Sequence, residues 1–219
     1  VTLFLGIPLL ISSLYLTKKD LLKGKLLLAG TLGYFLYTYA SYALYSMYNT
    51  MFLVYLLLMS ASFFTFTITM LSFDLAKLSS RFQEKLPVKL VGGFLIFVAS
   101  LVGLMWLGMI VPSLIQGTVP PQVEHYTTLI IQALDLGLLV PISIIGGVLL
   151  IRRKPWGYLL GTVIIVKEIT LFSSLTAMII GQARAGVQMG ILQMALFPLF
   201  NLIAIYCLIV LLKNIKEVA

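Results

Sequence analysis

Long apolar runs separated by short polar stretches dominate the chain. Most runs approach the about 20 residues that a helix needs to cross about 30 Å of hydrocarbon. Helices are expected because a lipid-exposed strand would leave backbone N–H and C=O groups without partners. The pattern therefore predicts a single all-α domain, residues 1–219, built as a polytopic membrane protein with a seven-transmembrane-helix bundle. The expected spans are 1–16, 26–48, 51–72, 90–111, 126–151, 156–180 and 187–212; because the first is short and opens at Val1, we expect N-terminal residues to be missing from it.

The composition is that of a membrane protein. Hydrophobic residues make up 61% of the chain and charged residues 10%, whereas a soluble domain carries about 25% charged residues. So few charged side chains cannot cover a water-facing surface, which excludes a soluble globular protein. The net charge of +8 does not indicate a nucleic-acid partner, because the basic residues lie in short loops and form no patch interleaved with exposed aromatic residues.

Basic residues alternate between the loops. Thirteen of the fifteen Lys and Arg residues follow the first, third, fifth and seventh apolar runs. The opposite loops hold only Arg184, and Lys167 lies inside the sixth run. By the positive-inside rule, we expect a multi-pass protein of the cell (plasma) membrane with its N-terminus outside and its C-terminus cytosolic. The thirteen are Lys18, Lys19, Lys23, Lys25, Lys77, Arg81, Lys85, Lys89, Arg152, Arg153, Lys154, Lys213 and Lys216.

The expected cytosolic loop 73–89 has an amphipathic pattern. Its apolar positions recur at steps of three and four residues, with basic residues between them. These apolar positions are Leu75, Leu78, Phe82 and Leu86. The pattern predicts a short helix that lies on the inner leaflet; anchoring to lipid is the favoured interpretation, and docking of a cytosolic protein partner is the alternative.

The fifth span is expected to be the longest helix. Its outer loop ends in the Pro-Pro dipeptide 120–121, which is typical of a helix start. The predicted helix 121–151 would be about 46 Å long at 1.5 Å per residue, so it should protrude from the bilayer. We expect a kink at Pro141 and motion that hinges there and at the glycine pair 146–147.

Three ionisable residues lie inside the apolar runs: Asp135, Lys167 and Glu168. Each costs roughly 2.5–3.5 kcal/mol to insert into hydrocarbon, so each needs a partner or a role. At 1.5 Å per residue from the basic loops, Asp135 lies about 25 Å up, Lys167 about 20 Å and Asn201 about 18 Å. Polar groups from several helices should therefore meet in one layer, slightly outside the midplane.

This layer predicts a polar cavity in the outer half of the bundle. The residues expected to bind substrate or a proton are Asp135, Lys167, Glu168, Asn201, Thr65 and Tyr37. The residues expected at the entrance of the cavity are Glu124, His125 and Gln132. Glu124, Thr128, Gln132 and Asp135 recur at steps of four, four and three, which predicts one helical stripe.

Two plainer interpretations stay open. Asp135 and Lys167 can form only a structural ion pair, which would leave Glu168 as a candidate proton-binding carboxyl. Ser and Thr side chains in membrane helices commonly bond to their own backbone or to a neighbouring helix.

Several kinds of chemistry are disfavoured. One histidine, His125, and one cysteine, Cys207, cannot form a two-His metal site or a thiolate cluster. The zinc-protease, nucleophile-elbow and phosphate-loop motifs do not occur. We therefore expect no catalytic residues, no metal and no cofactor, and favour a protein that is not an enzyme.

Four blocks carry a resemblance. They are E-H-Y-T-T (124–128), Q-A-L-D-L-G (132–137), R-R-K-P-W-G-Y-L-L (152–160) and V-K-E (166–168). These blocks resemble segments of an uncharacterised family of prokaryotic polytopic membrane proteins. The resemblance implies a prokaryotic host and attaches no function.

The favoured function is binding or transport of a small solute or ion, coupled to protons, by a protein surrounded by membrane lipids. The first alternative is a receptor-like seven-helix binding module, or a subunit that works with a separate partner. The third is a lipid-active membrane enzyme with Glu168 or Asp135 as acid or base. It ranks lowest because candidate nucleophiles and metal ligands are lacking.

Overall fold

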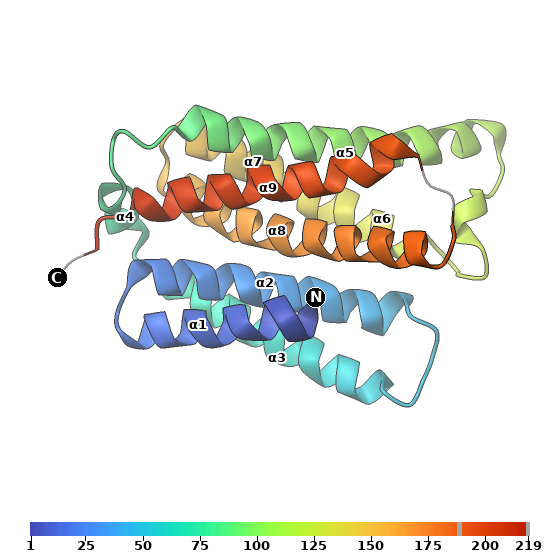
Figure 1. The fold of residues 1–219 in the computed structure, drawn as a ribbon, viewed down its shortest axis with the longest axis horizontal. Coiled ribbons are helices and arrows are strands. Elements are labelled where there is room, and N and C mark those ends of the chain that lie inside the picture. The colour runs from blue at the N-terminus through green and yellow to red at the C-terminus, as the bar shows by residue number, and fades with distance from the viewer. Residues whose placement is uncertain (188–189, 218–219) are drawn as a thin grey trace.

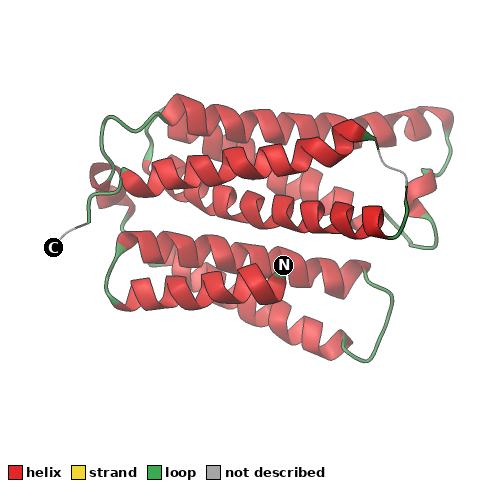
Figure 2. Ribbon diagram, viewed as in Figure 1, coloured by secondary structure: helices red, strands yellow, loops and turns green. Residues whose placement is uncertain are grey.

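The computed structural model describes residues 1–187 and 190–217, most of which are helical (Figures 1 and 2). In this part of the chain there is no strand, and one isolated antiparallel bridge joins Phe82 to Ile215. The elements are η1 (Thr2–Gly6), α1 (Ile7–Lys18), α2 (Leu22–Tyr45), α3 (Phe52–Leu71), α4 (Leu75–Leu78), η2 (Ser79–Arg81), α5 (Val88–Gln116), η3 (Pro121–Val123), α6 (Ile130–Leu134), η4 (Asp135–Leu139), α7 (Val140–Ile151), α8 (Pro155–Arg184) and α9 (Ile191–Lys213). Here η1 and η4 are π-helices, and η2 and η3 are 3-10 helices. Each predicted apolar run coincides, within a few residues, with a helix or an unbroken series of helices.

Five helical segments of the described residues are long and apolar enough to cross a membrane: α3, α5, the run Ile130–Ile151, α8, and Met194–Lys213 within α9. The run Thr2–Lys18 is apolar but shorter, and α2 is not among the five. The all-α class is confirmed, and these helices are of the kind found in a multi-pass membrane protein. A count of seven spans and the orientation of the termini stay predictions.

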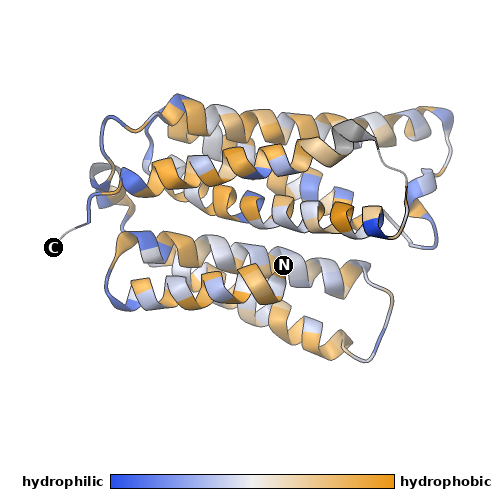
Figure 3. Cartoon of the chain, viewed as in Figure 1, coloured by the Kyte–Doolittle hydropathy of each residue, from blue (hydrophilic) through white to orange (hydrophobic). Residues whose placement is uncertain are grey.

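Helices α2 and α8 form the centre of the bundle (Figure 1). α2 packs against α1 and α3 on one side and against α8 on the other; α8 also packs against α7 and α9, and α5 packs against α7. In the most apolar stretch of α8, 56% of the residues are buried in the protein, but only 6% are buried in that of α3, although α3 is mostly hydrophobic (Figure 3). Lys167 and Glu168 therefore lie on the most enclosed of the five long helices.

Two glycines allow helices to approach closely where the bundle is tightest. A Cβ on Gly30 of α2 would lie 2.5 Å from Cβ of Val166 on α8, one residue before Lys167. A Cβ on Gly147 of α7 would lie 2.7 Å from the carbonyl oxygen of Gly92 on α5. Both distances are too short for a real Cβ atom, so the helix pairs α2–α8 and α5–α7 depend on glycine at these contacts.

The loops that carry most of the basic residues meet at one end of the bundle, called the basic end below. Nη2 of Arg153, in the α7–α8 turn, donates to the carbonyl of Glu84, 2.7 Å away, in the segment before α5. The N–H of Gln83 donates to the carbonyl of Asn214 at 2.9 Å, which joins that segment to the end of α9. Lys25 Nζ donates to the carbonyl of Ser72 at 2.6 Å, which joins α2 to the end of α3.

The prediction of an amphipathic helix on the inner leaflet is wrong. The segment 73–89 contains one four-residue helix, α4, followed by the single turn η2. Leu78, Phe82 and Leu86 are buried in the protein, and the Phe82 ring stacks on Tyr158 of α8 with the centroids 4.5 Å apart. These apolar side chains close the end of the bundle, because the ends of α8 and α9 offer them an apolar surface, and so they are not available to lipid.

The prediction of a long helix over residues 121–151 is also wrong, because the helix does not start at residue 121. The Pro-Pro dipeptide begins only the turn η3, and Glu124 follows with a φ of 48°, in the left-handed region that ends a helix. The helix begins at Ile130 instead. A π-helix, η4, ends two residues before Pro141, where a kink was predicted, and the kink itself stays a prediction. Pro141 has no N–H to donate to the Gly137 carbonyl, and a wider turn separates its ring from that carbonyl.

Candidate functional site

Asp135 is a buried carboxylate held by two donors from other helices. The Tyr37 hydroxyl on α2 donates to Oδ1 at 2.7 Å, and Nε1 of Trp106 on α5 donates to Oδ2 at 2.9 Å. Asp135 itself is the first residue of η4 and is 8% exposed. Three elements distant in sequence thus meet at one side chain, and each carboxylate oxygen has a neutral donor, as buried polar groups require.

Lys167 of α8 lies over the ring of Tyr37, whose hydroxyl donates to Asp135. Its Nζ is 4.4 Å from the centroid of the Tyr37 ring, a cation–π geometry. Nζ is buried and has no hydrogen-bond partner, and among the described residues no carboxylate lies within 4.0 Å of it. The alternative that Asp135 and Lys167 form a structural ion pair is therefore not what the structure shows: Tyr37 bridges the two residues, with its hydroxyl on Asp135 and its ring on Lys167.

Glu168, the next residue of α8, is as enclosed as Lys167. Its carboxylate makes no hydrogen bond within the described chain, and Oε2 is buried without a partner. An unsatisfied buried polar group costs about 1–3 kcal/mol, and more when it is charged. Lys167 and Glu168 thus lack hydrogen-bond partners, whereas the nearby Asp135 has a donor on each of its two oxygens. The four residues Tyr37, Asp135, Lys167 and Glu168 are called the buried cluster below.

The other predicted binding residues lie elsewhere. Nδ2 of Asn201 on α9 donates to Oγ of Ser173 on α8 at 3.0 Å, and Oδ1 of Asn201 is buried without a partner. Thr65 is exposed on α3, and its carbonyl accepts the Thr69 hydroxyl at 2.7 Å. Many hydroxyls bond to their own helix in this way, as Thr170 does to the Lys167 carbonyl at 2.6 Å.

The predicted entrance residues form an exposed loop and not one helical stripe. Glu124 and His125 precede α6, and their side chains are 68% and 55% exposed, with 4.0 Å between Oε2 and Nδ1. Tyr126 stacks on Tyr45 at the end of α2, with the centroids 4.4 Å apart. Gln132 is half-buried on α6. The stripe fails because Glu124 and Thr128 lie before the helix begins.

Trp106 belongs to the candidate site but is not among the residues predicted from the sequence. An indole N–H within a long apolar run has no water to donate to and must find an acceptor on a neighbouring helix. That requirement was a usable signal, and Asp135 is the acceptor. The arrangement can fix one carboxylate, present the donors of Lys167, and exchange a proton at Glu168. Within residues 1–187 and 190–217, no three His, Cys, Asp or Glu residues gather closely enough to hold a metal ion.

Comparisons of the chain with protein-family models, with curated proteins and with solved structures gave no significant match. The resemblance to prokaryotic polytopic membrane proteins therefore stays a prediction. Because fold alone does not determine function, a function has to be argued from the chemistry of the buried cluster.

Proposed function

We propose that the chain is a multi-span membrane protein that binds a small solute or ion at the buried cluster and carries it across the membrane with a proton. The observation that carries the proposal is the pair Lys167 and Glu168: both are enclosed by protein, and neither has a hydrogen-bond partner among the described residues. Ionisable residues inside a membrane bundle usually pair with one another or line a path for ions, substrates or protons.

The roles within the buried cluster follow from its hydrogen bonds. Asp135 has a donor on each oxygen, so it acts as the fixed anion that keeps Tyr37 and Trp106 in place. Lys167 retains its donors and binds an acceptor group of the solute. Glu168 has no donor or cation to hold it, so it takes up and releases the coupled proton.

In this proposal seven segments cross the plasma membrane of a prokaryote, with the N-terminus outside. Two observations support it: the basic loops gather at one end, and the run Thr2–Lys18 is nearly long enough to span. α2 needs less apolar surface than a lipid-facing helix because α1, α3 and α8 surround it. Movement is assigned to η4, because π-turns are irregular points in a helix, whereas Gly146 and Gly147 are tightly packed against α8 and α5.

A flux assay tests this function. The full chain is reconstituted into vesicles that contain a pH-sensitive dye, and amino acids, small carboxylates and inorganic anions are added in turn, first without and then with a pH gradient. The proposal expects at least one of these solutes to move protons in the wild type, and Glu168→Gln to remove proton movement. Glu84→Gln, an exposed carboxylate at the basic end, is the matched control and should move protons like the wild type. Equal proton movement in Glu168→Gln and the wild type would contradict the role given to Glu168.

A further inference from the structure

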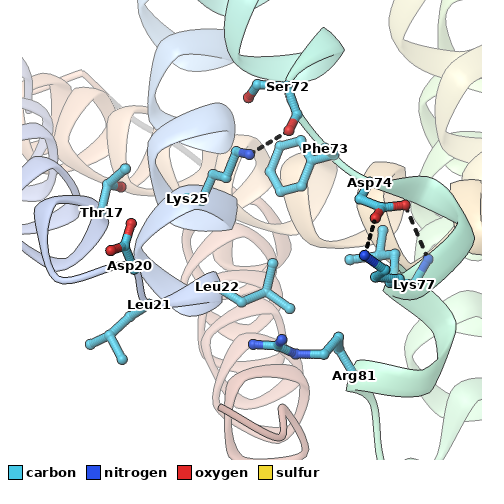
Figure 4. A pocket seen from close by; sticks show the side chains of 11 residues that line it. Thr17, Asp20, Leu21, Leu22, Lys25, Ser72, Phe73, Asp74, Lys77 and Arg81 are labelled. Carbon is cyan, nitrogen blue, oxygen red and sulfur yellow. Dashed lines mark hydrogen bonds and ion pairs between the residues drawn. The ribbon is translucent and has the colours of Figure 1, made fainter. Parts of the chain in front are cut away.

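A second candidate site lies at the basic end, where Lys25 precedes Tyr37 of the buried cluster by twelve residues on α2. A pocket of about 370 Å³ opens there between the α1–α2 turn, the first turns of α2, and the segment that links α3 to η2. Figure 4 shows Lys25 and Arg81 projecting toward it from α2 and η2, with Phe73 beside Lys25. None of these residues belongs to the buried cluster.

Two cations in this pocket keep unused donors. Lys25 Nζ makes one hydrogen bond, to the Ser72 carbonyl at 2.6 Å, and lies 4.7 Å from the centroid of the Phe73 ring. An ammonium has three donors, so others remain. Arg81 uses Nε on the Lys216 carbonyl at 3.0 Å, and its Nη2 is 3.9 Å from Glu217, beyond hydrogen-bond distance. A guanidinium presents five donors, and those on its terminal nitrogens make no hydrogen bond within the described residues, although Nη2 forms this long ion pair with Glu217.

Most of the nearby acids are already occupied. Asp74 accepts from the N–H of Lys77 as the cap of α4 and pairs with Lys77 Nζ at 3.2 Å, and the hydrogen bond from Lys77 lowers the pKa of Asp74. Glu217 accepts the N–H groups of Leu22 and Lys23 at 2.9 and 3.0 Å, at the start of α2. Asp20 lies on the α1 side of the pocket, opposite Arg81 (Figure 4). Among the described residues, Lys25 forms no ion pair and Arg81 forms only the long one with Glu217, so these are the two cations of the pocket that keep donors for an added anion.

Helices with exposed apolar side chains flank the pocket. α1 and α3 end at it through Thr17 and Ser72, and both helices present large exposed apolar side chains toward their ends. Leu14 and Tyr15 of α1, and Ile68 and Leu71 of α3, are examples. A ligand with acyl chains could lay them along these faces while its charged part enters the pocket, which a free inorganic ion could not do.

We propose that this pocket binds the phosphate of a membrane phospholipid headgroup, held by Lys25 and Arg81. Basic pockets between membrane helices at the cytosolic face are a recognised place for lipid phosphates, and Arg pairs with phosphate in a forked geometry. Phe73 supports Lys25, and the acyl chains lie against α1 and α3. The bound lipid would join the α1–α3 layer to the segment before α5.

Binding of phosphatidylglycerol to the delipidated full chain in detergent, followed by native mass spectrometry, tests this proposal. Each basic residue near a phosphate contributes about fivefold to affinity, so Lys25→Met and Arg81→Gln should each weaken binding about fivefold and the double variant about 25-fold. Lys85→Gln, an exposed lysine of the same loop outside the pocket, is the matched control and should bind like the wild type.

A second comparison uses only the wild-type protein, so it stands even where a variant fails to fold. A diacyl glycolipid without phosphate should bind at least tenfold more weakly than phosphatidylglycerol, and millimolar inorganic phosphate should displace little of the bound phospholipid. Glycolipid binding as tight as that of phosphatidylglycerol would overturn the phosphate assignment. Full displacement by inorganic phosphate would assign the pocket to a free anion and overturn the lipid assignment, and unchanged affinity in the double variant would overturn the role of Lys25 and Arg81.

Discussion

Tyr37 links Asp135 and Lys167, two of the three acidic or basic residues of the buried cluster. Its hydroxyl donates to Asp135 and its ring lies over Lys167, so one side chain on α2 organises groups from η4 and α8. Such an arrangement keeps the carboxylate and the ammonium from pairing directly. A direct pair would compensate both charges and use at least one of the three donors of Lys167.

Removal of the Tyr37 hydroxyl tests that link. In Tyr37→Phe the ring stays over Lys167, but Oδ1 of Asp135 loses its donor, which costs about 1–3 kcal/mol for a buried acceptor. We expect a lower free energy of unfolding, measured by denaturant titration in detergent micelles. Tyr42→Phe is the control, because Tyr42 is exposed on the same helix and should change stability by less than about 0.5 kcal/mol. Equal stability of the two variants would show that the bond to Asp135 contributes nothing.

Lys167→Met separates function from stability. The structure gives Lys167 no hydrogen-bond partner, so an apolar side chain of similar length should raise the free energy of unfolding by about 1 kcal/mol or more. The same variant should lose binding of every solute that stabilises the wild type in a thermal-shift screen. A large loss of stability would mean that Lys167 has a structural partner in the folded protein.

The residues of the buried cluster were predictable to different degrees. Asp135, Lys167 and Glu168 could be chosen from the sequence because hydrocarbon does not tolerate lone ionisable groups. Tyr37 was also among the predicted binding residues, but its contacts and the residue Trp106 could not be predicted, because hydrogen bonding depends on helix rotation. The contact of Trp106 with Asp135 requires α5 to pack beside η4, and the contact of Tyr37 with Lys167 requires α2 to approach α8 at Gly30.

At the scale of the element, the apolar periodicity of a segment did not show whether its apolar side chains contact lipid or other parts of the protein. The pattern in 73–89 is satisfied as well by the ends of α8 and α9 as by a leaflet, and the structure uses the protein. The Pro-Pro dipeptide does not start the predicted long helix: it begins only the three-residue turn η3, which ends at the positive φ of Glu124. The other span boundaries were predictable because long apolar runs leave little choice of register along the membrane.

The contact between α5 and α7 gives a prediction at this scale. In Gly147→Ala the new Cβ would lie 2.7 Å from the backbone carbonyl of Gly92, so the helices must separate. We expect a loss of about 1–3 kcal/mol in the free energy of unfolding, as for overpacked cores. Gly108→Ala on α5 is the control: a Cβ there meets nothing within 4 Å, and alanine should be neutral or stabilise the helix by about 0.5–1 kcal/mol. Similar stability of the two variants would contradict the close contact.

At the scale of the whole molecule, α2 and α8 are the two central helices of the bundle. They must pack against neighbours on several sides, so they hold the polar and small residues that lipid-facing helices avoid. The buried cluster lies on their shared side, and the basic end closes the bundle away from it. The predicted alternation of charge is consistent with this arrangement, because the loops that share a sign also share an end.

Orientation is tested by labelling single cysteines in intact cells. The background is Cys207→Ala, which removes the one native thiol, a buried group on α9. With a membrane-impermeant maleimide, His125→Cys should label in intact cells, and Lys85→Cys only after permeabilisation. Both positions are exposed, so access to the reagent depends on the side of the membrane. The reverse pattern would place the N-terminus in the cytosol.

The most direct test of the central claim is a high-resolution structure of the full chain in lipid nanodiscs, prepared with a solute found in the thermal-shift screen. The account predicts additional density within hydrogen-bond distance of Lys167 Nζ and beside Glu168, with Tyr37 and Trp106 still bound to Asp135. A dry interior in which Lys167 pairs directly with Asp135 or Glu168, and no density for the solute, would contradict a ligand site at the buried cluster.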